Sequence, residues 1–384
     1  MRGAPEVLGQ FPVSCLAEEI ATPGDGQIRG LITIAGNPAI SAPDAGKLQA
    51  ALPQLDALVS VDNWINETTC HADVILPGQS ALEIAHFDDL IWNWSVRNAG
   101  NYSPPVFPDP ERPQEWEILL NLAASCMGQE PGEKTARDLD DLFFHGLVDA
   151  LVQMPGFALE GRDAGEIIAA SREGHGPLRL LDFQIRSGPY GDHYGEKPDG
   201  LTLADFEAQP HGIDLGPLEP GLDRVLSTKS GRIELAPDYI TADLERLQAR
   251  LGRPEPELLL ISRRHLRSNN SWMHNVPSLV TGKDRCTLIV HPDDAATHGL
   301  RHGGRARISS AAGSVVAPVE VSDEMMPGVV CLPHGWGHDV PEARVSVAAE
   351  HAGVNNNLLA PGELVDEISG NQVVNGIPVE IAPL

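Results

Sequence analysis

The sequence has few basic residues and no long apolar run. It contains 27 Lys and Arg against 54 Asp and Glu, a formal net charge of −27 at pH 7. Nucleic-acid phosphates and anionic lipids are bound by clustered cations that displace counterions, so this charge argues against both as partners. No apolar stretch is long enough to cross a bilayer, and the N-terminus lacks a basic segment followed by an apolar one. We expect a cytoplasmic protein without a membrane span, whose partners are small molecules or proteins.

Cysteine is scarce, and no pair of cysteines has the close spacing of zinc or iron–sulfur ligands: the chain has Cys15, Cys70, Cys126, Cys286 and Cys331. Two histidine pairs, His298 with His302 and His334 with His338, have the spacing of a zinc-binding helix. Glycines interrupt both stretches and disfavour a helix. We therefore expect no metal ligands in this chain and retain only His334, as a cofactor contact.

Motifs of common hydrolases are also absent. The sequence contains no Gly-x-Ser-x-Gly elbow, no Walker loop and no His-Glu-x-x-His helix. Its many carboxylates lie mostly in predicted helices and solvated loops, where a chance pair has little meaning. No residue is predicted to act as a nucleophile, so the catalytic residues stay unassigned.

The first third of the chain alternates strand and helix patterns. Residues 28–35 form a β-branched run, residues 43–55 have helical apolar spacing, and residues 58–61 form a second apolar run. This order predicts a βαβ unit with parallel strands. Ser41 and Asp44 fit a capping box at the start of the intervening helix.

Polar residues follow these strands where an open parallel sheet binds ligands, beyond the carboxyl ends of its strands. Gly36 allows a ligand to approach the backbone closely, Asn37 offers a donor and an acceptor, and Asp62 suits a ribose or a guanine edge. Alternatively, residues 36–38 form a strand-ending turn and Asp62 caps a helix. A third strand, residues 72–76, follows the polar turn that begins at Asn66-Glu67-Thr68.

The rest of the chain divides into a mixed and a β-rich part. Residues 131–253 contain helical patterns and a long loop over residues 187–220 that is rich in Gly and Pro. Beyond residue 254, short β-rich runs separated by turns predict a small closed barrel. Two of its loops, residues 263–274 and 332–338, are dense in Arg, Ser, Asn, His and Trp, which suit pyrophosphate and a flat heterocycle.

The order and spacing of Gly36, Asp62 and Pro77, followed by Asn355-Asn356-Asn357, resembles the C-terminal half of molybdopterin-dependent oxidoreductases of the dimethyl sulfoxide reductase and formate dehydrogenase family. The similarity is strong over residues 28–125 and 228–384 and loose between them. It implies an α/β plus β fold, in which a partial Rossmann-like parallel sheet domain precedes a small six-stranded double-psi β-barrel. We expect a partial α/β dinucleotide-binding domain over residues 1–130, a connecting region of helices and loops over 131–253 and the barrel over 254–384.

The resemblance also implies a cofactor. It is bis-molybdopterin guanine dinucleotide with molybdenum or tungsten, while the [4Fe-4S] cluster and the protein ligand of the metal belong to an N-terminal half that this chain lacks. A targeting signal would lie there too. The expected cofactor-binding residues are Gly36, Asn37, Pro38, Ser41, Asp62, Asn66, Glu67, Thr68, Asp73, Arg264, Asn269, Asn270, Ser271, Trp272, His274, His334, Trp336, Asn355 and Asn356.

The implied function is that of a cofactor-binding portion of an oxidoreductase that transfers electrons to or from a small substrate, with a formate-dehydrogenase-like activity preferred. We expect the chain to be inactive and marginally stable alone, and to need the N-terminal half or an electron-transfer subunit as its partner. The alternative is a non-catalytic nucleotide-binding or structural module of a redox complex.

Overall fold

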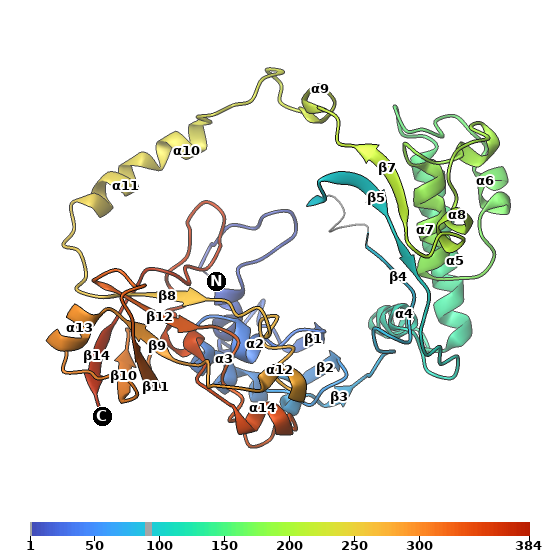
Figure 1. The fold of residues 1–384 in the computed structure, drawn as a ribbon. Coiled ribbons are helices and arrows are strands. Elements are labelled where there is room, and N and C mark those ends of the chain that lie inside the picture. Colours follow the sequence, from blue (N-terminus) through green and yellow to red (C-terminus); the bar gives the residue numbers. More distant parts are fainter. Residues whose placement is uncertain (1, 89–93) are drawn as a thin grey trace. The chain divides into compact units, whose positions relative to one another are not determined.

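The computed structural model describes residues 2–88 and 94–384 (Figure 1). Its contacts divide the chain into two units, of which the first joins residues 1–77 to residues 242–384 and the second comprises residues 78–241. This grouping differs from the three consecutive segments expected from the sequence. The first unit is discontinuous because the N-terminal sheet packs with the C-terminal part of the chain, as the hydrogen bonds described below show.

The N-terminal part of the first unit is an α/β layer. Its three strands are parallel in the order β1-β2-β3, as the βαβ pattern predicts. The buried positions Leu48, Ala51 and Leu52 confirm the predicted helical spacing and pack with Ile20 against one face of the sheet. The elements are η1 (Val13–Cys15), α1 (Leu16–Ala21), β1 (Gly30–Ile34), α2 (Pro38–Ser41), α3 (Ala45–Ala51), η2 (Leu52–Gln54), β2 (Ala57–Val61), η3 (Thr69–His71) and β3 (Val74–Ile75).

The predicted capping box is wrong. Ser41 is the last residue of α2, and its hydroxyl donates to the carbonyl of Asn37 within the same turn, at 2.9 Å. Asp44 precedes α3 in the left-handed conformation without a capping hydrogen bond from its side chain. The short helix α2 takes up the residues that the box would need, and the Asp44 amide instead donates to the carbonyl of Ala360 at 2.8 Å.

The C-terminal part of the first unit is a curled mixed sheet (Figure 1) of seven strands in the order β13-β8-β12-β9-β11-β10-β14, where six were expected. The five β-rich runs after residue 257 all form strands, while the two short strands at the end were not predicted. Interior-facing aliphatic residues form one continuous core. The elements are α11 (Leu244–Leu251), β8 (Leu259–Arg263), α12 (Pro277–Val280), β9 (Leu288–Val290), α13 (Pro292–Thr297), β10 (Arg305–Ser309), β11 (Ser314–Val321), β12 (Val329–Pro333), α14 (Ser346–Glu350), η6 (Asn356–Leu359), β13 (Ile377–Pro378) and β14 (Glu380–Pro383).

The second unit contains helices and two small antiparallel sheets, β4-β6 and β5-β7. Residues 78–130 belong to it because α4 packs on α5 and β5 pairs with β7. The expected loop over residues 187–220 is wrong, since it contains η5, α8 and β7. The elements are β4 (His86–Phe87), β5 (Arg97–Gly100), β6 (Tyr102–Ser103), α4 (Glu115–Cys126), α5 (Glu133–Leu151), α6 (Ala164–Ala170), α7 (Pro177–Ser187), η5 (His193–Gly195), α8 (Leu203–Glu207), β7 (Ile213–Pro217) and α9 (Leu222–Val225), followed by α10 (Asp238–Ala242) at the boundary.

None of the helices in residues 2–88 and 94–384 combines the length and the apolar character that a bilayer crossing requires.

Candidate functional site

The loops that follow β1 and β2 meet at the carboxyl edge of the parallel sheet, as predicted. The Asn37 side chain donates from Nδ2 to Oε2 of Glu67 at 2.7 Å and accepts from the hydroxyl of Thr68 at 2.7 Å. The same hydroxyl accepts from the amide of Ala39, in the first turn of α2, at 3.0 Å. These contacts fix the helix entry against the second loop and satisfy both ends of the Asn37 amide within the protein.

Asp62 and Asn66 brace the second loop from inside. Oδ1 of Asp62 accepts from the amide of Trp64 at 2.9 Å, and Oδ2 accepts from the Asn66 side chain at 3.0 Å. The Asn66 side-chain oxygen in turn accepts from the amides of Thr68 and Thr69. Burial raises the pKa of Asp62 despite these hydrogen bonds. Asp62 thus caps a turn, not the helix that the alternative named, since the next helix, η3, begins only at Thr69.

Four of the expected residues make no side-chain hydrogen bond between the two loops at this edge. A Cβ on Gly36 would meet its neighbours only at 3.7 Å or more, so packing within the chain does not require glycine there. The left-handed residue is Ala35, at a φ of 48°. Asp73 precedes β3 and therefore lies at the opposite edge, where it accepts from the amide of Leu58 at 2.8 Å. The exposed Ser41 hydroxyl bonds within α2, in which Pro38 is the first residue.

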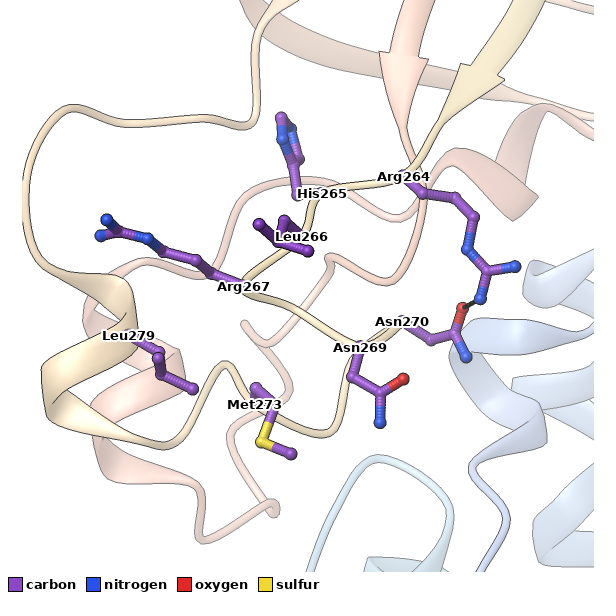
Figure 2. Close-up of a pocket in the computed structure, with 8 residues that line it drawn as sticks. All are labelled: Arg264, His265, Leu266, Arg267, Asn269, Asn270, Met273 and Leu279. Atoms are coloured by element: carbon purple, nitrogen blue, oxygen red, sulfur yellow. Dashed lines mark hydrogen bonds between the residues drawn. The ribbon is translucent and has the colours of Figure 1, made fainter. Parts of the chain in front are cut away.

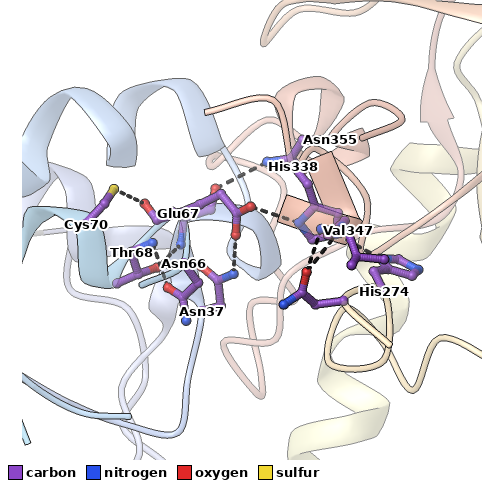
Figure 3. A network of polar contacts seen from close by, with 12 residues as sticks. Asn37, Asn66, Glu67, Thr68, Cys70, His274, His338, Val347 and Asn355 are labelled. Carbon is purple, nitrogen blue, oxygen red and sulfur yellow. Dashed lines mark hydrogen bonds and ion pairs between the residues drawn. The ribbon is translucent and has the colours of Figure 1, made fainter. Parts of the chain in front are cut away.

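Two histidines from the loops of the C-terminal sheet connect to Glu67 in a row of contacts (Figure 3). Oε1 of Glu67 lies 2.8 Å from Nδ1 of His338, and Nε2 of His338 lies 2.8 Å from Nδ1 of His274. All three side chains are buried, with exposed fractions of 1%, 4% and 3% for Glu67, His338 and His274. We call this set the Glu–His–His chain.

The surroundings of the Glu–His–His chain decide the charges of Glu67 and His274. Burial opposes ionisation of Glu67, yet hydrogen bonds from His338 and Asn37 and the charge of His338 hold its pKa below the usual value. Burial, reinforced by the neighbouring His338, lowers the pKa of His274 to about 3. The carboxylate is therefore ionised, and His274 is neutral near pH 7.

Side-chain contacts hold the conformation of the loop after β8. Arg264 donates to the Asn270 side-chain oxygen at 2.6 Å, and Nε2 of His334 lies 2.9 Å from the same oxygen. Nδ1 of His334 lies 3.3 Å from the Ser262 hydroxyl. Burial, with the charge of Arg264, lowers the pKa of His334. Asn269 and Asn270 both have positive φ, which shapes the loop's bend.

Two glycines let the loop after β12 pass close to its neighbours. At Gly335, with a φ of 83°, a Cβ would lie 2.3 Å from the carbonyl oxygen of Asn270. At Gly337, with a φ of 117°, it would lie 2.6 Å from Cβ of Asn355. Only glycine allows this backbone path and these contacts. The glycines that argue against a zinc helix are thus the residues that bring His334 and His338 into place.

A pocket of about 590 Å³ lies beside the loop that follows β8 (Figure 2). Arg264 and Arg267 provide cationic groups at its wall, and the amides of Asn269 and Asn270 provide donors and acceptors. Such a lining suits phosphate oxygens. The full lining is Arg264, His265, Leu266, Arg267, Asn269, Asn270, Met273 and Leu279. The expected residues Ser271 and Trp272 lie on the same loop outside the lining, and Trp272 is 61% exposed.

Buried polar atoms without hydrogen-bond partners gather in the same loops. They include Nε2 of His265, Nε2 of His274, Nε1 of Trp336 and Oδ1 of Asn356. Trp336 is 4% exposed, and its ring lies against His274 with ring centroids 4.0 Å apart. An unpaired buried polar atom costs about 1 to 3 kcal/mol. The set therefore fits a flat ligand that carries both donors and acceptors, as a pterin does.

The three asparagines near the C-terminus have different tasks. The Asn355 and Asn357 amides donate to the carbonyls of Ala39 and Ile40 at 3.2 and 2.7 Å, which attaches α2 to the C-terminal part. Asn356 donates to the Ser262 hydroxyl at 3.3 Å and leaves its own oxygen unpaired. Of the three, Asn356 is the one whose side chain keeps a buried atom without a partner.

Sequence reasoning missed His338 and the structural role of Asn357. The glycines around His338 argue against a zinc-binding helix. They give no indication that His338 forms a hydrogen bond with Glu67, which lies 271 residues away in the sequence. A usable signal was the placement of a histidine in a glycine-rich loop directly after a buried strand. In the described part of the chain, no group of three or more His, Cys, Asp or Glu side chains is arranged to hold a metal ion.

Comparisons with known proteins agree with this geometry. Residues 1–125 match the molybdopterin oxidoreductase family, and residues 258–378 match the molydopterin dinucleotide binding domain. The assimilatory nitrate reductase catalytic subunit of Bacillus subtilis (strain 168) is 25% identical over 317 residues, which cover 81% of this chain and 38% of that protein. Biotin sulfoxide reductase of Cereibacter sphaeroides is 25% identical over 366 residues, covering 85% of this chain and 42% of that protein.

A solved structure has the same fold. Acetylene hydratase from Pelobacter acetylenicus superposes with a TM-score of 0.64 at 16% identity, over 97% of this chain and 46% of that one. The chain thus spans less than half of the length of each of these relatives. The two matched ranges carry the parallel sheet and the polar loops of the site, and the chain belongs to the molybdopterin oxidoreductase family.

Proposed function

We propose that the chain is the C-terminal cofactor-binding portion of a bis-molybdopterin guanine dinucleotide oxidoreductase, which contains molybdenum or tungsten and transfers electrons to or from a small substrate. The observation that carries this proposal is the group of unpaired buried atoms on His265, His274, Trp336 and Asn356 beside an arginine-lined pocket. When bound, the cofactor supplies the redox chemistry, while the protein binds and orients it.

The residues divide by chemistry. Arg264, Arg267, Asn269, Asn270 and Ser271 would hold phosphates, because guanidinium and amide groups match phosphate oxygens. The unpaired atoms would pair with the pterin edge, with Trp336 against a ring face and Trp272 at the entrance. His334 would support this loop through Asn270. At the parallel sheet, residues 36–38 and Asp62 would lie beside a guanine dinucleotide, with Asn66, Glu67 and Thr68 beneath them.

The architecture extends this proposal. We propose double-psi topology for the curled seven-stranded sheet, together with an N-terminal partner that contributes the [4Fe-4S] cluster and the metal ligand. An open face of the parallel sheet supports such a partner. Ile32, Ile34 and Val74 are 43%, 51% and 46% exposed there, whereas parallel sheets are normally covered on both faces. An electron-transfer subunit and a cytoplasmic location belong to the same proposal.

Formate is the substrate that we propose to test first. The preference rests on the likeness of residues 36–38 and 66–68 to segments of formate dehydrogenases. The relatives named above act, by their names, on nitrate and biotin sulfoxide, so these two compounds are the natural competitors in the assay.

A second candidate is a non-catalytic nucleotide-binding or structural module of a redox complex. The observation that favours it is the internal pairing of the parallel-sheet edge. There the side chains of Asn37, Glu67 and Thr68 satisfy one another without a ligand. A module that binds one dinucleotide through the C-terminal loops alone would have this arrangement.

Co-expression with an N-terminal half of the same family, followed by purification, separates the two candidates. The proposal predicts molybdenum or tungsten and about two guanine nucleotides per complex, with no metal on this chain alone. About one nucleotide and no metal in either preparation would support the binding module and reject the oxidoreductase. Formate, nitrate and biotin sulfoxide are then assayed with the purified complex.

A further inference from the structure

We propose that Glu67, His338 and His274 form a proton relay that switches Nε2 of His274 between hydrogen-bond acceptor and donor toward the edge of a bound pterin. This inference rests on the proposed function, since it takes the pterin as the ligand. It starts from the three buried side chains, which are joined by two contacts of 2.8 Å and end in an unpaired nitrogen.

The hydrogen-bond pattern allows two states. When His338 is neutral, its Nδ1–H donates to the Glu67 carboxylate, so its Nε2 accepts from Nδ1–H of His274. Nε2 of His274 is then a bare acceptor. When His338 carries an additional proton, its Nε2–H donates to Nδ1 of His274, and the neutral His274 carries its proton on Nε2. One proton therefore reverses the role of the terminal nitrogen.

The burial of each group decides where the additional charge resides. His274 is held neutral by burial and by its neighbour, so it changes tautomer without storing charge. His338 lies against the Glu67 carboxylate, which is paired with Asn37 and stays ionised. A positive charge on His338 is thus balanced at 2.8 Å, while one on His274 is not.

Few titratable groups lie near the Glu–His–His chain. Near the carboxylate end, burial and the charges of Glu342 and Glu67 raise the pKa of Cys70, which keeps the thiol protonated. Near the other end lies His265, whose pKa is lowered by burial and by Arg263. The carbonyl of Gly335 is also near the His274 ring and favours its protonated form, but it does not satisfy Nε2.

The proton step balances without electrons. A proton delivered to Nε2 of His274 from a ring N–H of a bound pterin would be matched by transfer of the Nδ1 proton of His274 to Nε2 of His338, which would become an imidazolium beside Glu67. His274 would be neutral before and after, and the proton would be held by the pair of His338 and Glu67. The relay thus moves one positive charge away from the cofactor without any movement of the backbone.

The test is ¹⁵N NMR of the full chain labelled at histidine, recorded from pH 8 to pH 5, the range in which histidines usually titrate. A His274→Asn variant identifies the His274 signals. We expect His274 to stay neutral throughout and to change from the Nδ1–H to the Nε2–H tautomer as the pH falls. Glu67→Gln removes the anion that balances a charge on His338, so His274 should keep the Nδ1–H tautomer over this whole range.

Glu363→Gln is the matched control, because it removes one carboxylate of the same unit that pairs with Lys47 instead. A single His274 tautomer at all pH values in the wild-type chain, or equal behaviour of the Glu67 and Glu363 variants, would overturn the relay. The complex with the N-terminal half gives a second readout. Its nucleotide content tests the proposed function, while the tautomer change in the free chain tests the relay independently.

Discussion

The two parts of the candidate site satisfy their polar groups in opposite ways. At the edge of the parallel sheet, the side chains of Asn37, Glu67 and Thr68 bond to one another and to the backbone. In the loops of the C-terminal sheet, His265, Trp336 and Asn356 keep buried atoms without partners. The difference teaches that high polar density alone does not mark a binding surface. The first part acts as a scaffold, and the second keeps polar atoms unpaired, which is what the proposed cofactor site requires.

The largest expected effect tests the scaffold. Glu67→Ala leaves the buried side chains of Asn37 and His338 without their shared partner. We expect a loss of about 3 kcal/mol in the free energy of unfolding, measured in urea. Glu363→Ala, at an exposed carboxylate, should change it by less than about 0.5 kcal/mol. Equal effects would show that the scaffold does not depend on Glu67.

A smaller loss is expected within the C-terminal part, beside the Asn355 that attaches α2. Gly337→Ala forces a Cβ to within 2.6 Å of Asn355 at a φ of 117°. The clash and the strained backbone should lower the free energy of unfolding by about 2 kcal/mol. Gly146→Ala in α5, where a Cβ meets nothing within 4 Å, should instead be neutral or stabilising. A harmless Gly337→Ala would contradict the close approach of these loops.

The ligand-facing part is tested by binding. Arg264→Ala should weaken guanine-nucleotide binding about tenfold, because one charge-assisted hydrogen bond contributes about 1.5 kcal/mol. Folding stability should change little, since the side chain makes its hydrogen bond within an exposed loop. Arg307→Ala, at an exposed position in β10, is the control in the same titration. Unchanged binding by the Arg264 variant would place the phosphates elsewhere.

The last expected effect is a dependence of the wild-type chain's stability on pH. The pKa of His274 is depressed to about 3 in the folded chain, from an ordinary value of 6.5. Between these values the unfolded state binds the additional proton, so stability is full above pH 6.5 and falls as the pH decreases. The slope should be about 1 kcal/mol per pH unit between pH 6 and 4. Urea unfolding of His274→Asn should show a shallower slope, and an unchanged slope would contradict a buried neutral His274.

The sequence predicts the local patterns well and the long-range partners poorly. The parallel strands, the buried spacing of Leu48, Ala51 and Leu52, and the β-rich runs all follow from periodicity. The predicted capping box at Ser41 was wrong because Ser41 is the last residue of the short helix α2. Asp73 was expected among the cofactor-binding residues, but it precedes β3 and lies at the edge opposite Asn37 and Glu67.

The role of His338 shows why the long-range partners in the site could not be predicted from the sequence. Its partner Glu67 lies 271 residues away, so no local pattern reports the contact. The unpaired atoms of Trp336 and Asn356 are equally invisible, because whether a polar atom is satisfied depends on the whole fold. Residue type suggested that these side chains belong to a polar site, and the geometry divided them into side chains with paired atoms and side chains with unpaired atoms.

The attachment of α2 by Asn355 and Asn357 also bears on how the chain is made. The carbonyls of Ala39 and Ile40 emerge from the ribosome long before the two asparagines that bind them, which follow 316 and 317 residues later. At roughly 5 to 20 residues per second, the N-terminal sheet waits tens of seconds for these partners. Throughout that time the carbonyls of Ala39 and Ile40 lack these partners, and early association with another chain or a chaperone is the natural protection for a polypeptide built in this order.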